Sequence, residues 1–331
     1  MTRASIVVPV RGGAALTAQC LDHLEAVLGE REDVEVVVVD DGSADGTADV
    51  VRRHPRVRLV EHAAAGGFAR SCNDGAAAAQ GDYLVFLNND TAAGERWLDA
   101  LVRYADEHRS AAAVGAKLVY PNGTIQHAGI VICGDLLPRH VYRSFPGDHP
   151  AVNRARPFQA VTGACMLVRR SLFEQLNGFD AAFTNGFEDV DLCLRLAAAG
   201  HEIHYCPDSV SVHLEAVTRG NDPDAFRRNV ALYLERWGGS LRPDDLATYA
   251  SDGLVRVVPD DVYPLELEVS PLLAVPTQAL AASALRLLGL RSHQVFDLLK
   301  ENALLRARLA ELELERVRAT SEDRAALVVE I

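Results

Sequence analysis

The stretch VEVVVVDDGS, residues 34–43, is a continuous run of β-branched residues that stops abruptly at two aspartates. A similar run, SIVVPV at residues 5–10, precedes it, and a helical pattern spans Leu16 to Leu28 between them. Strands that are apolar on both faces belong to parallel sheets covered by helices. The two runs therefore predict a βαβ unit within an α/β fold. Ligands of such sheets bind at the carboxyl ends of the strands, where Asp40 and Asp41 fall.

The alternation of apolar runs and helical periods continues to residue 120. It predicts a helix over Ala48 to His54, a strand over Val57 to Val60, a helix from Gly66 to Ala79, a strand over Tyr83 to Leu87, a helix over Glu95 to His108 and a strand over Val114 to Tyr120. Asn88-Asn89-Asp90 follows a strand, where it suits either a hard-metal ligand or an Asn-rich turn. No GxGxxG follows the first strand, which disfavours a dinucleotide-binding unit.

A cluster of acids opens another predicted helix, in GFEDVDLCLR at residues 186–195. Glu188, Asp189 and Asp191 all fall in its first turn. Any helix start attracts acids, because its backbone N–H groups are unpaired and the macrodipole is positive there. Three acids this close together repel one another, which costs more free energy than one capping acid would. We therefore favour a functional site over a simple helix cap.

The composition bounds the class of protein. The 331 residues include 33 Lys and Arg against 46 Asp and Glu, a net charge of −13, without a long basic run. This balance argues against nucleic acid as a partner and against strongly electrostatic membrane contact. The six cysteines are far apart and are expected to be reduced core residues. No signal peptide or membrane-spanning run is recognised, so a cytoplasmic location is expected.

Six short motifs and a late histidine follow one another along the chain. They are DDGS at residues 40–43, GGFARSCNDGA at 66–76, LVFLNND at 84–90, AVTGACMLVRR at 160–170, GFD at 178–180, GFEDVDLCLRL at 186–196 and His213. Together they resemble the family 2 glycosyltransferases, inverting enzymes with the GT-A fold. The nearest likeness is to the rhamnosyltransferase-like bacterial members that build O-antigen and other surface polysaccharides, and it covers about residues 4 to 240.

The resemblance implies a nucleotide-diphosphate sugar as donor. A carboxylate can accept a hydrogen bond from a pyrimidine N–H or from a ribose hydroxyl. By the resemblance, the residues that line the donor cleft are Pro9, Val10, Asp40, Asp41, Arg70, Asn73, Asn88 and Asn89. Arg219 is expected to steady the leaving diphosphate through charge-assisted hydrogen bonds.

A divalent cation, Mn²⁺ or Mg²⁺, is also implied. Asn88-Asn89-Asp90 stands where the family has Asp-x-Asp, whose last acid holds the ion. The first acid of that motif is Asn88 here, which leaves Asp90 as the main anionic ligand. His213 resembles the late histidine that completes the metal shell. Such ions usually take one or two carboxylates together with water and substrate phosphates, so a sparse protein shell suffices.

Asp189 matches the general base of the family's Glu-Asp motif, which takes the proton of the acceptor hydroxyl. One base acting on a single displacement should invert the anomeric configuration. Glu188 and Asp191 are expected to orient the acceptor or Asp189, or else to solvate the helix start. Gln126 and His127 are expected near the acceptor, which the resemblance implies is a carbohydrate or a lipid-linked carbohydrate.

Two other functions stay open. One is a sugar-phosphate nucleotidyltransferase on a similar fold, although Arg11-Gly12-Gly13 lacks the rest of that class's glycine-rich loop. The other is a degenerate glycosyltransferase that serves as a binding scaffold. The presence of Asp41, Asp90, Asp189 and His213 argues against a scaffold.

The run His201-Glu202-Ile203-His204 differs from the zinc signature HExxH. Its histidines are three residues apart on a probable strand, so they point to opposite faces. They are expected to be surface residues without a metal.

The organisation of the chain changes after residue 240. Residues 1–240 are expected to form the glycosyltransferase domain, and the proline-containing residues 241–278 a linker or wrapping arm. Residues 279–331 are expected to be a helical extension. Within it, 295–319 has leucines at heptad spacing and one polar a-site, Asn302, which favours a homodimeric coiled coil over a helix packed on its own domain. Leu280 to Leu290 is too short to span a bilayer but could lie on the inner face of a membrane.

Overall fold

A computed structural model of the chain describes residues 2–214, 222–258 and 266–273. The chain divides into two compact units, Met1–Thr248 and Tyr249–Ile331. The expected helical extension over 279–331, its coiled coil over 295–319, the apolar segment from Leu280 to Leu290 and Arg219 all lie outside the described residues.

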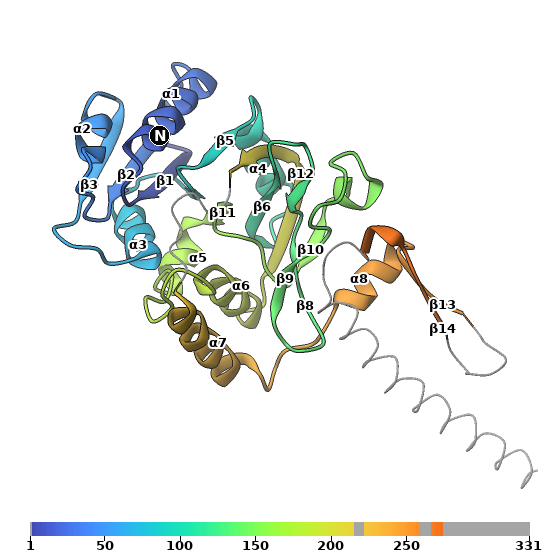
Figure 1. Ribbon diagram of the computed structural model, residues 1–331. Coiled ribbons are helices and arrows are strands. Elements are labelled where there is room, and N and C mark those ends of the chain that lie inside the picture. Colours follow the sequence, from blue (N-terminus) through green and yellow to red (C-terminus); the bar gives the residue numbers. More distant parts are fainter. Residues whose placement is uncertain (1, 215–221, 259–265, 274–331) are drawn as a thin grey trace, which may run out of the picture. The chain divides into compact units, whose positions relative to one another are not determined.

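The first half of unit 1 is the predicted βαβ alternation (Figure 1). Its strands are β1 (Ala4–Val10), β2 (Val34–Asp40), β3 (Val57–Glu61) and β4 (Tyr83–Leu87), and its helices are α1 (Ala14–Leu28), α2 (Thr47–Arg52), α3 (Phe68–Ala78) and α4 (Trp97–Glu107). β1 pairs in parallel with both β2 and β4, and β2 pairs in parallel with β3. The α/β class is confirmed, and the predicted element ends differ from the observed ones by no more than three residues.

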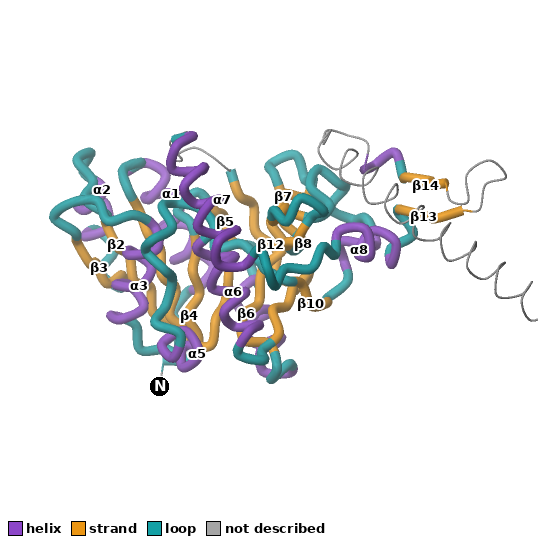
Figure 2. The backbone as a smooth tube through the Cα atoms, turned by 90° about the horizontal axis from the view of Figure 1, so that it is seen from below, coloured by secondary structure: helices purple, strands orange, loops and turns teal. Residues whose placement is uncertain are grey.

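The second half of unit 1 extends the same sheet with mixed pairing. It contributes β5 (Thr91–Ala93), β6 (Ala111–Val119), β7 (Ile125–His127), β10 (Arg156–Phe158), β11 (Cys165–Arg169) and β12 (Glu202–His213). Within the described residues the sheet has ten strands, in the order β10-β12-β6-β11-β4-β1-β2-β3, with β5 on β12 and β7 on β6. Figure 2 shows these strands side by side from β3 to β10. Because β11 lies antiparallel between β4 and β6, the sheet is mixed although mostly parallel in its first half.

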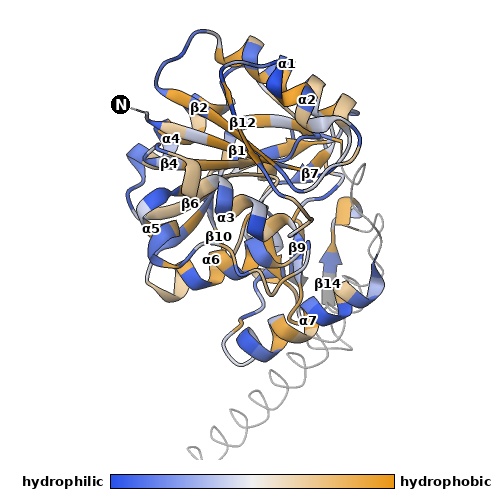
Figure 3. Cartoon of the chain, turned by 90° about the vertical axis from the view of Figure 1, so that its left-hand side faces the viewer, coloured by the Kyte–Doolittle hydropathy of each residue, from blue (hydrophilic) through white to orange (hydrophobic). Residues whose placement is uncertain are grey.

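The remaining elements of unit 1 lie around this sheet. They are the hairpin of β8 (Ile130–Ile132) and β9 (Pro138–His140), the 3₁₀ helix η1 (Pro150–Asn153), and the helices α5 (Arg170–Gln175), α6 (Glu188–Ala198) and α7 (Pro223–Trp237). Figure 3 shows α1 and α2 on one side of the sheet and α3, α5 and α6 on the other.

The hydrophobic core consists of two layers, one on each face of the sheet. Along β1, Val7 packs into one layer with Phe86 and residues of α6, whereas Ile6 and Val8 pack into the other with residues of α1 and α4. Alternate side chains of a strand point to opposite faces, which explains why both kinds of position are apolar here. The six cysteines are buried and unpaired, as predicted. Burial raises the pKa of Cys20 to about 12, which keeps this thiol protonated and unreactive.

The proline-containing stretch after residue 240 holds regular structure where it is described. α8 (Asp245–Ser251) is followed by the antiparallel pair β13 (Val255–Val258) and β14 (Glu266–Val269) and by the 3₁₀ helix η2 (Pro271–Leu273). Among the described residues, none of the helices combines the length and the apolar character that a membrane crossing requires.

Candidate active site

The carboxyl ends of the parallel strands bring the expected donor and metal residues to one edge of the sheet. Val10, at the end of β1, pairs with Asp40, at the end of β2. β4 ends just before Asn88, and the last residue of β12, His213, pairs with Thr91 of β5. The pairing of β12 with β5 thus places His213 beside the turn that contains Asp90. This location agrees with the rule for ligand sites in α/β sheets.

Asp41 fastens the end of β2 to the glycine loop that precedes α3. Its Oδ1 accepts hydrogen bonds from Nδ1 of His62 at 2.8 Å and from the N–H of Gly66 at 2.7 Å, and its Oδ2 accepts one from the N–H of Gly67 at 2.8 Å. Burial alone would raise the pKa of Asp41, but these hydrogen bonds outweigh it and lower the pKa. Asp41 is therefore an ionised anchor under the loop, with about one lone-pair site left for a further donor.

Asp40, Pro9 and Arg70 were also expected to bind the donor, and their positions suit this role to different degrees. Oδ1 of Asp40 accepts the N–H of Ser43 at 2.9 Å, which is the turn interaction that the sequence left open. Pro9 pairs with Val39 at the end of β1, as a strand-end contact requires. Arg70 is exposed beside Gly66, and its Nε lies 3.5 Å from Oδ2 of Asp74.

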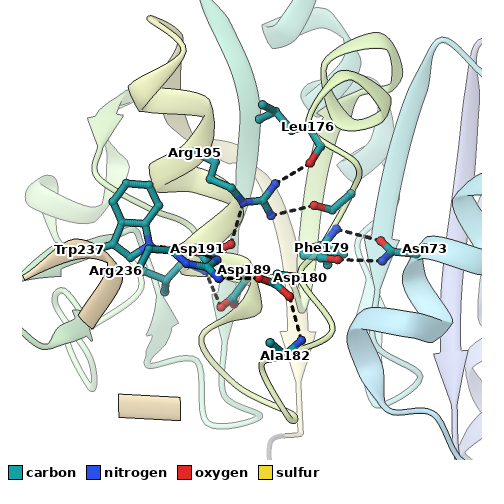
Figure 4. Close-up of polar contacts among 12 residues, drawn as sticks. Asn73, Leu176, Phe179, Asp180, Ala182, Asp189, Asp191, Arg195, Arg236 and Trp237 are labelled. Atoms are coloured by element: carbon teal, nitrogen blue, oxygen red, sulfur yellow. Dashed lines mark hydrogen bonds and ion pairs between the residues drawn. The ribbon is translucent and has the colours of Figure 1, made fainter. Parts of the chain in front are cut away.

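Two asparagines that were expected at the donor are occupied elsewhere. The amide of Asn73 donates to the carbonyl of Phe179 and accepts its N–H, both at 2.8 Å (Figure 4). Asn73 thus connects α3 to the loop between α5 and α6. Nδ2 of the buried Asn89 donates to Oγ1 of Thr17 on α1 at 3.0 Å. These contacts do not fit the expectation of direct donor binding, and they give both side chains a structural role.

Asp90 and His213, the two residues expected to hold a metal ion, lie beside each other. Oδ1 of Asp90 lies 3.0 Å from Nε2 of His213, and both side chains are buried. The carbonyl of Asp90 also accepts the N–H of Leu214 at 3.0 Å, which locks the end of β12 onto the turn. Nδ2 of Asn88 lies 3.4 Å from the same imidazole nitrogen. A carboxylate oxygen and an imidazole nitrogen thus converge on one point.

The donor set at this point fits a divalent cation with few protein ligands. One carboxylate oxygen and one imidazole nitrogen are a donor pair that such ions accept, while the other ring nitrogen of His213, Nδ1, is buried without a hydrogen-bond partner in the described part of the chain. Within the described residues, no cluster of three or more His, Cys, Asp or Glu side chains is placed to hold a metal ion. A cation at Asp90 and His213 would therefore take its other ligands from water and substrate oxygens, as Mn²⁺ and Mg²⁺ commonly do.

Asp189 is tied to the metal residues through one short segment. Its Oδ2 accepts the N–H of Gly163 at 2.9 Å. The carbonyl of the next residue, Ala164, accepts the N–H of Asn88 at 3.0 Å. Asp189 is half-buried in the first turn of α6, where the helix N-terminus favours its ionised form.

The other two acids of α6 are buried. Glu188 accepts the N–H of Gly186 and supports the turn in front of the helix. Asp191 has no exposed surface and accepts hydrogen bonds from Nε of Arg195 at 2.7 Å, Nη1 of Arg236 at 2.7 Å and Nε1 of Trp237 at 3.0 Å (Figure 4). The expected acceptor role does not fit Asp191, because both of its oxygens are engaged inside the fold. Two arginines also offset the repulsion among the acids.

The remaining expected acceptor residues lie beneath the surface. Gln126 and His127 are both buried on β7. Nδ1 of His127 lies 3.0 Å from Nδ1 of His140, and burial, followed by the nearby His140 and His213, lowers its pKa well below the usual range. His127 is therefore neutral and out of an acceptor's reach, although it lies near the metal pair.

The prediction that His201 and His204 are surface residues is wrong for His204. This side chain is buried on β12, where its Nδ1 lies 2.9 Å from the hydroxyl of Tyr104. Its Nε2 lies 3.0 Å from Oε2 of Glu202. Tyr104 belongs to α4, which packs on β12, and the alternation of residues along a strand does not reveal which helix packs on it. Among the described residues, His204 belongs to no cluster of potential metal ligands.

Two residues of the candidate site, His62 and Gly163, were not predicted from the sequence. His62 follows β3 directly and supports Asp41, so the strand-end rule that selected Asp40 would also have found it. Gly163 lies inside a recognised motif, but only the fold reveals that its N–H holds Asp189.

Comparisons with known proteins identify the family of the chain. The model of the family "Glycosyl transferase family 2" matches residues 5–176, and that of "N-terminal domain of galactosyltransferase" matches residues 148–216. The chain is 30% identical over 245 residues to N-acetylglucosaminyl-diphospho-decaprenol L-rhamnosyltransferase of Mycobacterium tuberculosis, which covers 66% of this chain and 79% of that protein.

Two longer relatives match with a smaller share of their own length. The O-antigen biosynthesis protein RfbC of Myxococcus xanthus is 37% identical over 150 residues, covering 44% of this chain and 12% of that protein. The uncharacterized protein y4gI of Sinorhizobium fredii is 30% identical over 258 residues, covering 70% and 27%. The chain thus spans about a quarter or less of these two relatives.

Solved structures share the fold. GalNAc-T7 with UDP, GalNAc and Mn²⁺ superposes with a TM-score of 0.58 at 15% identity, covering 76% of this chain and 51% of that one. The mannosyltransferase PcManGT from Pyrobaculum calidifontis, in complex with GDP-Man and Mn²⁺, gives 0.51 at 22% identity, covering 78% and 76%. The expected GT-A fold is confirmed, and the chain belongs to glycosyl transferase family 2.

Proposed function

We propose that this glycosyltransferase moves a sugar from a nucleotide-diphosphate sugar to a hydroxyl of a carbohydrate or lipid-linked carbohydrate, with inversion, in bacterial surface polysaccharide synthesis. The rhamnosyltransferase and O-antigen relatives support this acceptor class. The solved neighbours, which hold nucleotides or nucleotide sugars with Mn²⁺, support this donor class and a divalent cation.

The donor binds across the carboxyl ends of β1, β2 and β4. Asp41 holds the loop at Gly66 and Gly67 in place, and the lone-pair site that remains on its carboxylate suits a base N–H or a ribose hydroxyl. Arg70, exposed beside this loop, supplies a cation at the cleft. Asp90 and His213 would hold Mn²⁺ or Mg²⁺, which when bound neutralises the charge that develops on the departing diphosphate.

Asp189 takes the proton of the acceptor hydroxyl as the bond to the sugar forms. The positive end of the helix dipole stabilises its carboxylate, and hydrogen bonds from the N–H of Gly163 to Oδ2 and from the N–H of Val190 to Oδ1 hold the group in place. A base needs to lie about 3 Å from the hydroxyl that it deprotonates. Because attack and departure occur in one displacement, the anomeric configuration inverts.

The observation that carries this proposal is the link from Asp189 through Gly163 and Ala164 to Asn88, beside the Asp90 and His213 pair. Proton removal and leaving-group stabilisation must occur within one substrate's length, and a link of two hydrogen bonds through two adjacent residues supports such a proximity. A scaffold without activity would have no need of it.

The test is to incubate the full chain with a panel of nucleotide sugars and Mn²⁺, and to follow donor binding and release of nucleoside diphosphate. We expect at least one donor to bind and to be slowly hydrolysed. A parallel reaction with nucleoside triphosphates and sugar 1-phosphates tests the nucleotidyltransferase alternative, for which release of pyrophosphate is the signal. Failure of every donor to bind would overturn the transferase proposal.

A further inference from the structure

The turn in front of α6 has an unusual backbone. Asn185, Gly186 and Phe187 have φ angles of 51°, 148° and 73°, all on the positive side. For residues other than glycine such angles are strained and persist only where the surrounding structure enforces them. The turn leads directly into Glu188 and Asp189. Something must therefore hold it, and whatever holds it also aims Asp189.

Asn229 of α7 is the side chain that holds this turn. It is 3% exposed, its Nδ2 donates to the carbonyls of Thr184 and Gly186, both at 2.9 Å, and its Oδ1 accepts the N–H of Thr184 at 3.0 Å. Both the NH₂ group and the carbonyl oxygen of the Asn229 side chain thus hydrogen-bond to the backbone of this turn. A buried amide satisfied in this way specifies one geometry, because any other leaves polar groups unpaired.

Contacts on both sides of the turn further stabilise its position against α7. The ring of Phe187 lies against Tyr233 and Phe226, with centroids 5.2 Å and 5.9 Å away. On the other side, Oδ1 of Asn185 accepts the N–H of Phe68 at 3.1 Å. Phe68 follows the glycine loop that Asp41 holds. The turn therefore joins α7, the base helix and the donor loop.

The remainder of α6 is anchored independently of this turn. Asp191 is held by Arg195 of the same helix and by Arg236 and Trp237 at the end of α7. Loss of the Asn229 contacts would leave this anchor intact. It would release only the first turn of the helix, where Asp189 meets Gly163.

We propose that Asn229 is a positioning residue for the transfer reaction: it keeps the turn at 184–187 in its strained form and thereby orients Asp189 towards the acceptor hydroxyl. This inference rests on the proposed role of Asp189 as base. Asn229 bonds to the turn backbone at Thr184 and Gly186, whereas the contact of the turn with the donor loop runs through the side chain of Asn185. We therefore expect the loss of Asn229 to lower the rate of transfer far more than the donor affinity.

The test compares Asn229→Ala with Arg227→Ala, a matched change on the exposed side of α7, where Arg227 pairs with Asp224. We expect Asn229→Ala to lower kcat at least tenfold while the donor KM and the Mn²⁺-dependent donor affinity stay within twofold of the wild type. Arg227→Ala should match the wild type. Unchanged kcat, or equal loss of donor affinity and kcat, in Asn229→Ala would overturn the inference.

A double variant separates positioning from general damage. If Asn229 acts through Asp189, then Asn229→Ala in an Asp189→Asn background should cause no further loss of the residual rate. A further tenfold loss there would contradict the inference. If Asn229→Ala fails to fold, Phe226→Ala is the variant to measure, because Phe226 is 57% exposed and its ring packs on that of Phe187 in the turn. It should lower kcat severalfold at constant donor KM, and an unchanged kcat would count against the inference.

The same experiments keep this inference apart from the proposed function. Full activity in Asp189→Asn alone would overturn the assignment of the base, whatever Asn229 does. An inactive Asp189→Asn together with a fully active Asn229→Ala would overturn only the inference.

Discussion

Oδ2 of Asp189 accepts a hydrogen bond from the backbone N–H of Gly163 at 2.9 Å, and this contact joins α6 to the segment that precedes β11. A Cβ atom added at Gly163 would lie 3.4 Å from Cβ of Asp189, so the two backbones approach closely. The contact between the proposed base and the segment that leads to Asn88 therefore depends on this close approach, as suits a preorganised site.

The metal pair should control donor binding. Asp90→Ala removes the main anionic ligand, so Mn²⁺-dependent donor affinity should fall by more than about tenfold, since even indirect partners of a metal cost that much. Titration calorimetry with and without Mn²⁺ measures the effect. Asp49→Ala, an exposed acid on α2, is the matched control and should leave the affinity unchanged. Donor binding that is as tight without Mn²⁺ as with it would contradict the assignment.

Asp41 should stabilise the fold in a pH-dependent manner. Its pKa is lowered in the folded state, so its contribution is complete above the pKa of an unfolded aspartate, about 3.9, and is lost as the pH falls through the lower folded pKa. Asp41→Asn should therefore lower the free energy of unfolding by about 1–3 kcal/mol at pH 7. The difference from the wild type should shrink below pH of about 4. Urea unfolding at several pH values checks both, and a pH-independent difference would refute the ionised anchor.

Asp191 should matter for stability. Removing one partner of a buried ion pair leaves a charge uncompensated and typically costs about 3–5 kcal/mol. Asp191→Asn, facing Arg195 and Arg236, should therefore lower the free energy of unfolding by an amount of that order, as measured by chemical denaturation. Asp189→Asn, two residues earlier in the chain at a half-buried position, should change it much less. Equal stability of Asp191→Asn and the wild type would revive a role at the acceptor.

Much of the fold was predictable because strand and helix periods are local. β4 has the predicted bounds, Tyr83–Leu87, since its apolar residues end sharply at Asn88. The position of Asp41 and Asp90 also followed from the sequence, because parallel strands end at a common edge.

The roles of individual polar residues were less predictable. Asp191 and Asn73 were placed at substrates, but their partners Arg236 and Phe179 lie 45 and 106 residues away in the chain. A linear pattern identifies an acid at a helix start, and it cannot tell whether an arginine from another helix covers it. The strain at Phe187 is equally invisible, because nothing in its sequence neighbours demands a positive φ.

The most direct test of the central claim is a paired measurement on Asp189→Asn. Donor affinity and transfer rate are determined for this variant and for the wild type, with the donor and acceptor that the panel identifies. We predict that the variant binds the donor with Mn²⁺ as tightly as the wild type, while transfer falls by about 10²–10⁴-fold, because only the base is lost. A donor affinity that falls together with the rate would make Asp189 a donor or metal ligand and would contradict its assignment as the base.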